Sequence, residues 1–203
     1  QILKNNKHLK AKIDEENTNR KSNKLKEFKW ILSLTPLLSL TLFVTGVMTL
    51  LQIILPLDLA NGGIIRPPIL AQRVALLLTF KLILISIFQW PIGYMIRNKS
   101  SSLKFRFCLI SLLIGFICLS LSNFFHNGYI LILIAFIPLT IALCIFLPSA
   151  SDAIIKSAPI QYHGSAIALY SQCFGISALT IPWLAGKLID NLNTAFELWL
   201  IVS

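Results

Sequence analysis

Charged residues are scarce in this chain, and acidic residues and histidines are the scarcest of them. Only 13% of the residues are charged, with 8 Asp or Glu and 3 His. Soluble domains carry about 25% charged residues, so this composition excludes an ordinary soluble domain. His8, His126 and His163 stand far apart without a partner for a Ser or Cys nucleophile, and no glycine-rich phosphate loop is present. We therefore expect no enzyme activity and no cofactor.

Cysteine is also rare, and its spacing carries no motif. Cys108, Cys118, Cys144 and Cys173 lie in or beside apolar stretches, with no CxxC pair and no histidine at a ligand spacing. A cysteine in such surroundings behaves as a small apolar residue. The pattern argues against both a disulfide framework and a metal site.

Long apolar runs are abundant. The mean hydropathy is +0.76, and 56% of the residues are hydrophobic. A helix needs about 20 mainly apolar residues to cross a bilayer, and no alternating barrel pattern is visible, so the runs predict transmembrane helices. The predicted fold is all-α, a polytopic transmembrane helix bundle. Its spans are residues 30–56, 69–94, 105–122, 129–150 and 165–188, with a sixth run at 196–203.

Basic residues are distributed unevenly over the predicted loops. Nine of the eighteen Lys and Arg precede Trp30, and five more lie in the loops after the second and fourth spans. These segments share one side of the membrane, so the positive-inside rule places the N-terminal segment in the cytoplasm. We expect the membrane to be the plasma (inner) membrane. The net charge of +10 then reflects topology, and no nucleic-acid partner is expected.

Both ends of the chain are interpreted as cut. Residues 1–29 read as a basic cytoplasmic linker, because Asn, Thr and Ser interrupt their weak helical pattern. The first residue is Gln1, and the last residues up to Ser203 lie inside an apolar run. We expect a fragment of a longer protein.

Two motifs lie at the ends of predicted spans. The first is QWPIGYMIRN at residues 89–98, followed by Lys104 and Arg106; the second is HGSAIALY at 163–170, followed by IPWLAG at 181–186. Their order and spacing resemble the major facilitator superfamily, in the loop between the second and third helices and in the fourth loop and fifth helix of a six-helix half. The resemblance covers nearly everything after Trp30. It implies a transporter half that packs against a missing second six-helix half of the same chain.

The resemblance also implies an inner gate, with departures from the usual pattern. Arg97 stands where the family has an acidic residue that helps to lock the cytoplasmic gate, and His163 stands where an Arg is usual. Degenerate loops of this kind, and a basic segment before the first span, point to the C-terminal half. The gate residues implied are Trp90, Pro91, Gly93, Arg97, Lys104, Arg106, His163 and Gly164.

Lys81 is the strongest single candidate for a functional residue. It lies near the centre of the second predicted span, where a charge costs about 2.5–3.5 kcal/mol on insertion scales. Arg73 and Gln89 lie eight residues to either side, loosely on the same face. Lys81 either attracts an anionic substrate group in a water-filled cavity or is a structural lysine bonded to carbonyls or to a carboxylate in the missing half.

A second polar stripe follows the first predicted span. Thr41, Thr45 and Thr49 repeat at every fourth residue, and Gln52 follows three residues later, so all four share one helical face. This face either lines the same cavity or packs against a neighbouring helix, since Thr hydroxyls bond the carbonyl four residues earlier and small polar residues favour helix interfaces.

Carboxylates are absent from the centres of the predicted spans. Asp58, Asp152, Asp190 and Glu197 all lie at span ends or in loops. A proton-coupled carrier needs a titrating group inside the membrane, so we expect that group in the missing half.

The sequence therefore predicts a secondary active transporter in a lipid bilayer that moves a small-molecule substrate by alternating access. That substrate is an anionic or polar metabolite or an effluxed compound. The alternative is a non-transporting sensor or assembly protein on the same scaffold. The candidate substrate-binding residues are Lys81, Arg73, Gln89, Thr45, Thr49 and Gln52.

Overall fold

The computed structural model describes residues 2–191 and Trp199. Every regular element in this part of the chain is helical, which confirms the all-α fold class. Five of the helices are long and apolar enough to cross a membrane. The elements are α1 (Ile2–Asn61), α2 (Ala71–Ile96), α3 (Ser101–Ser122), α4 (Gly128–Ser157), the short 3-10 helix η1 (Ile160–Tyr162) and α5 (His163–Asn191).

The first helix runs further than the apolar run predicts. Pro56 lies inside α1, because a proline removes one backbone donor without preventing the following residues from continuing the helix. The helix ends at Asn61, since Gly62 adopts a φ of 86° and its N–H donates to the Asp58 carbonyl at 3.0 Å. This left-handed glycine is a common way to end a helix.

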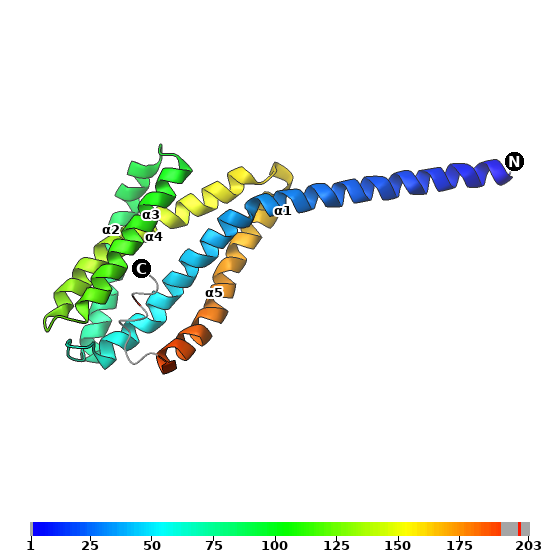
Figure 1. Ribbon diagram of the computed structural model, residues 1–203. Helices are drawn as coiled ribbons and strands as arrows, with labels where there is room; N and C mark the ends of the chain where they lie inside the picture. The colour runs from blue at the N-terminus through cyan, green and yellow to red at the C-terminus, as the bar shows by residue number, and fades with distance from the viewer. Residues whose placement is uncertain (1, 192–198, 200–203) are drawn as a thin grey trace.

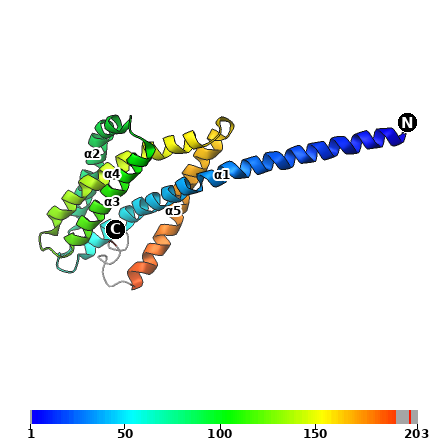
Figure 2. The same cartoon turned by 45° about the horizontal axis from the view of Figure 1, so that its top comes forward.

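The N-terminal part of α1 is continuous with the first span. The backbone of residues 2–29 is helical, and Figures 1 and 2 show that it projects well beyond the rest of the bundle. The candidate span itself is Trp30–Asn61. The sixth apolar run predicted at residues 196–203 lies outside the described residues, except for Trp199.

Helix α4 is the central helix of the bundle. It packs closely against α3 and α2 and also contacts α1 and α5, while α1 and α5 form a second close pair (Figure 1). Pro138 and Pro148 lie inside α4, and its last part leaves the direction of its first part in Figures 1 and 2. Prolines are the usual cause of such bends. The helix ends at Ser157, because the next residue, Ala158, has an extended backbone before Pro159.

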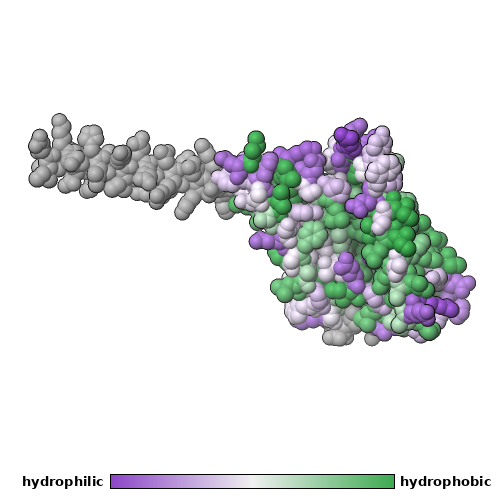
Figure 3. Space-filling view, turned by 180° about the vertical axis from the view of Figure 1, so that it is seen from behind, coloured by the Kyte–Doolittle hydropathy of each residue, from purple (hydrophilic) through white to green (hydrophobic). Residues whose placement is uncertain are grey.

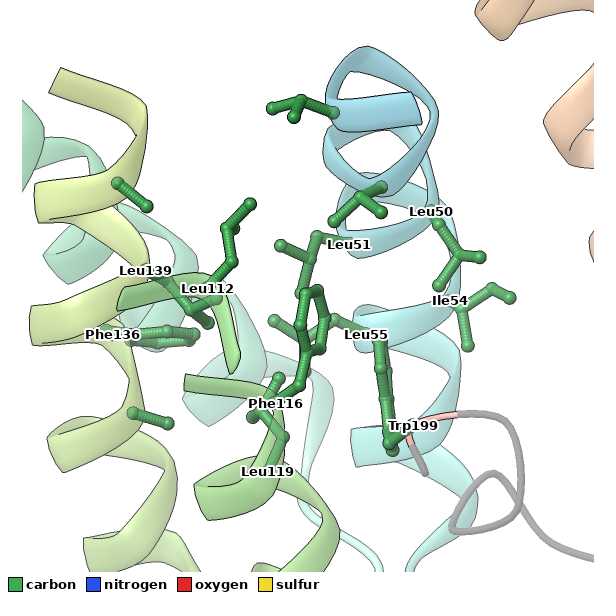
Figure 4. Packing of buried hydrophobic residues seen from close by; sticks show 14 of the residues in the cluster. Leu50, Leu51, Ile54, Leu55, Leu112, Phe116, Leu119, Phe136, Leu139 and Trp199 are labelled. Carbon is green, nitrogen blue, oxygen red and sulfur yellow. The ribbon is translucent and has the colours of Figure 1, made fainter. Parts of the chain in front are cut away.

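The core joins α1 to α3 and α4 through large apolar side chains. Figure 4 shows Leu51 and Leu55 pointing from α1 toward Phe116 on α3, with Phe136 and Leu139 of α4 beyond it. Phe116 also stacks on Trp199, with ring centroids 5.9 Å apart. Since lipid is as apolar as these side chains, close packing is what holds such helices together.

The outer surface of the bundle suits a membrane. Hydrophobic residues cover much of the side seen in Figure 3, and hydrophilic residues gather largely toward its ends. Helices that follow one another in the chain run antiparallel (Figure 1), so the bundle has two distinct ends. We call the end with Arg97, Lys99, Lys104 and Arg106 the basic end. The other end carries the α1–α2 and α3–α4 connections.

Candidate functional site

A cavity of about 260 Å³ lies between α1, α2 and α4, with Phe174 of α5 in its wall. Three of the predicted polar residues line it: Gln52 from α1, and Lys81 and Gln89 from α2. Lys81 and Gln89 are eight residues apart, or about 12 Å along the helix axis. The cavity therefore follows α2 for about two turns, with Ile85 between the two polar residues.

Lys81 is a largely buried lysine with no partner among the described residues, although its Nζ keeps some exposed surface. Its relative exposure is 7%, and it makes no hydrogen bond or ion pair with any other described residue. It lies in the middle third of α2, well away from both ends of the bundle. A lone buried charge is costly unless something of opposite charge or a hydrogen-bond acceptor reaches it. The site is therefore suited to an anionic or strongly accepting group.

The threonines of α1 serve helix packing more directly than cavity lining. Thr41, Thr45 and Thr49 each donate to the carbonyl four residues earlier, at 2.8, 2.8 and 2.9 Å. The hydroxyl of Thr45 is also 2.8 Å from that of Ser177 on α5. Among the four residues of this predicted stripe, only Gln52 lines the cavity.

Arg73 lies in a different pocket from Lys81. Its side chain is exposed and lines a surface pocket of about 450 Å³, together with Arg66, His126 and Tyr129. This pocket lies near the start of α2 and α4, at the end opposite the basic end. The predicted stripe of Arg73, Lys81 and Gln89 is thus divided between two pockets.

The first predicted gate segment ends α2 at the basic end. Trp90 is 81% exposed and stacks on Tyr94 with centroids 6.4 Å apart. Pro91 lies inside the helix, and a Cβ added to Gly93 would meet no atom within 4 Å. The basic residues that follow are at the C-cap of α2 and in the first turns of α3: Arg97, Lys104 and Arg106.

The second predicted gate segment begins α5 at the same end. A ring nitrogen of His163 lies 3.1 Å from the Ala158 carbonyl, and Gly164 has open space where a Cβ would lie. Trp30, at the start of the first span, stacks on Tyr162 with centroids 5.1 Å apart. These contacts tie the α4–α5 connection to α1.

Asp58 and Arg66 form a buried ion pair that sequence reasoning missed. Arg66 Nη2 lies 3.0 Å from Asp58 Oδ1, and the two side chains are 1% and 2% exposed. The same nitrogen donates to the Asp58 carbonyl at 3.0 Å, so its contact with Oδ1 is an ion pair and not an aligned hydrogen bond. Arg66 Nη1 donates to Ser122, and Trp199 Nε1 donates to Asp58 Oδ2 at 3.1 Å. In the sequence, this pair is indicated only by an acidic residue before and a basic residue after the two glycines of the α1–α2 loop.

Close backbone packing fixes this ion pair in place. The Ile65 N–H donates to the Asn123 carbonyl at 2.9 Å, which joins the α1–α2 loop to the end of α3. A Cβ at Gly63 would lie 2.3 Å from Asn123 Oδ1, and one at Gly128 would lie 2.2 Å from the Ser122 carbonyl oxygen. Gly63 allows the α1–α2 loop to approach the end of α3, and Gly128 allows the α3–α4 turn to close, more tightly than any other residue would.

The described part of the chain contains no candidate metal site. No three His, Cys, Asp or Glu side chains gather there closely enough to hold an ion. The cysteine nearest to the cavity is Cys144, whose Sγ lies 3.8 Å from the Ile85 carbonyl oxygen.

Comparison with known proteins gives one finding. A family model described as Major Facilitator Superfamily matches residues 6–202, nearly the whole chain. No curated protein and no solved structure matches. The match agrees with the resemblance carried by the motifs at residues 89–98 and 163–186.

Proposed function

Since the chain belongs to the Major Facilitator Superfamily, a family of membrane transporters, we propose that it moves a small solute by alternating access. In this mechanism a binding site near the middle of the membrane opens in turn to each side. The five candidate spans and the cavity between them suit that role.

The observation that carries the proposal is the position of Lys81. A largely buried lysine in the middle of a span, without a partner among the described residues, is expensive, and such residues are usually functional. It shares its cavity with Gln52 and Gln89, whose amides donate and accept hydrogen bonds. These three residues would bind the solute, while Thr45, bonded to Ser177, would hold α1 against α5.

The proposed orientation places the basic end in the cytoplasm of a plasma (inner) membrane. The end of α2, the α2–α3 connection and the first turns of α3 carry four cations there, while the opposite end carries three: Arg66, already paired with Asp58, Arg73 and Lys187. Trp90, Pro91 and Gly93, with the second segment at His163 and Gly164, would then form part of the inner gate.

We further propose that a second six-helix half completes the transport path. Of the candidate spans, α2 and α5 bury the smallest share of their apolar windows. Exposed apolar residues on both helices, among them Ile87 and Leu179, leave faces that another bundle would cover. In this family architecture, rocking of the two halves opens the site alternately.

The test is solute flux into proteoliposomes made with the full-length protein. Radiolabelled benzoate, choline and glucose would report an anion, a cation and a neutral solute. We expect uptake of at least one of them above that of empty liposomes, and loss of that uptake in Lys81→Met. A protein that inserts correctly but moves none of a broader panel of solutes would favour the non-transporting sensor or assembly protein.

A further inference from the structure

The wall of the Lys81 cavity has an unusual charge composition. Among the described residues that line it, Lys81 is the one cation, Gln52 and Gln89 are neutral and polar, and none is a carboxylate. The remaining wall is mainly aliphatic or aromatic, including Met48, Leu51, Ile85, Leu143, Leu147 and Phe174. Such a wall gives a ligand one charged anchor and a large apolar surface.

Arg66, the other buried basic residue in the described part of the chain, has a carboxylate partner within the protein, although its Nε makes no hydrogen bond. Arg66 is 3% exposed, pairs with Asp58 and donates to both Ser122 and a backbone carbonyl. Lys81 is nearly as buried but has none of these contacts among the described residues. The contrast points to a partner for Lys81 that enters from outside the protein.

We propose that this cavity selects a monoanion with an apolar body, such as a carboxylate or sulfonate on a hydrocarbon or aromatic frame. The proposal rests on the proposed function, because it takes this cavity as the substrate site. The anionic head would lie at Lys81, with amide donors from Gln52 beside it, and the body would follow Ile85 along α2 toward Gln89. A second negative charge would lie unpaired against apolar side chains, and that is costly.

The size of the cavity narrows the ligand further. Its volume of about 260 Å³ falls below the roughly 300–1,000 Å³ of pockets that hold drug-sized molecules. The part of the site that this half supplies would therefore hold a single ring or a short chain of the ligand.

A matched series of four probes tests the charge and the apolar body separately. Benzoate has both features, benzamide lacks the charge, acetate lacks the body, and terephthalate has a second charge. Binding to the purified full-length protein is followed by the shift of its thermal unfolding midpoint. We expect benzoate to bind about tenfold more tightly than each of the others, which corresponds to about 1.4 kcal/mol. Lys81→Met should remove the preference for benzoate over benzamide, and Lys81→Arg should keep it.

A second measurement does not depend on finding a ligand that fits. In a chain whose four cysteines are replaced, Gln52→Cys is modified with a negatively and a positively charged methanethiosulfonate of similar size. We expect Lys81→Met to lower the ratio of the two rates by about tenfold, since Lys81 attracts the anionic reagent. Asn98→Cys, on the exposed α2–α3 connection, should show an unchanged ratio.

The outcomes separate this proposal from the proposed function. A rate ratio at position 52 that Lys81→Met leaves unchanged would overturn it, as would equal binding of benzoate and benzamide. Flux of choline or glucose in preference to benzoate would overturn it while leaving the transporter intact. Selective binding of benzoate without any flux would support it and contradict transport.

Discussion

Arg66 Nη2 lies 3.0 Å from Asp58 Oδ1, and this ion pair closes the end of the bundle opposite the basic end. The pair forms because Gly62 turns the chain back after α1, which brings Arg66 over the last turn of that helix. Ser122 and Trp199 then supply further hydrogen bonds. The α1–α2 loop, the end of α3 and the C-terminal Trp199 are thus held together by two charged side chains.

Breaking this pair should be strongly destabilising. Asp58→Asn leaves Arg66 buried without its counter-ion, and removing one partner of such a pair costs about 3–5 kcal/mol. The measurement is the free energy of unfolding in detergent. Lys156→Ala is the matched control, because Lys156 and Asp152 form an exposed pair at 2.7 Å that is worth about 0.3–0.5 kcal/mol. Equal losses in the two variants would contradict the buried pair.

Two helical glycines should respond differently to alanine. A Cβ at Gly115 would lie 2.5 Å from Leu139 Cγ, so Gly115→Ala forces α3 and α4 apart and should cost about 1–3 kcal/mol. Gly175 has nothing within 4 Å, so Gly175→Ala should stabilise α5 slightly through its higher helix propensity. Thermal unfolding of the two variants checks the prediction. It would be refuted if Gly115→Ala were the more stable of the two.

Lys81 should reduce stability while supporting function. Replacing it by Met removes a partly desolvated charge that has no partner among the described residues, so Lys81→Met should raise the stability of the ligand-free protein while it abolishes transport. A structural lysine would behave in the opposite way, because its loss would leave carbonyls or a carboxylate unpaired. Unfolding and flux measured on the same preparation distinguish the two. Lower stability together with unchanged flux would establish the structural role.

The Thr45–Ser177 hydrogen bond should contribute to packing and not to solute binding. Interhelical hydrogen bonds of this kind average about 0.6 kcal/mol in membrane proteins. A double-mutant cycle with Thr45→Val and Ser177→Ala should therefore give a coupling energy of that size. The solute KM of Thr45→Val should stay unchanged, whereas Gln52→Leu should raise it. A larger effect on KM from Thr45→Val would assign this residue to the cavity.

The membrane spans could be predicted from sequence because lipid leaves the backbone few alternatives to a helix. The ends of the spans could not be predicted in the same way. In α1, Pro56 interrupts the apolar run without ending the helix, and the helix ends where Gly62 adopts a positive φ. The apolar pattern therefore locates the helices better than their boundaries.

The candidate site was only partly predictable from helical spacing. Eight residues rotate a helix by about 80° and advance it by about 12 Å, so Lys81 and Gln89 still reach one cavity. Arg73 and Gln89 differ by twice that rotation and lie in different pockets. The ion pair of Asp58 and Arg66 depends on how the α1–α2 loop packs against the end of α3, and the periodicity of the sequence does not predict such packing.

Side-specific labelling of Gln52→Cys tests the central claim most directly. The residue lines the cavity, and a membrane-impermeant thiol reagent reaches it only when the cavity is open to the side on which the reagent is added. Right-side-out and inside-out vesicles are labelled in turn. Alternating access predicts modification from both sides, and a bound anionic probe such as benzoate should slow the reaction in both. Modification from one side only, unaffected by any probe, would contradict a transport path through this cavity.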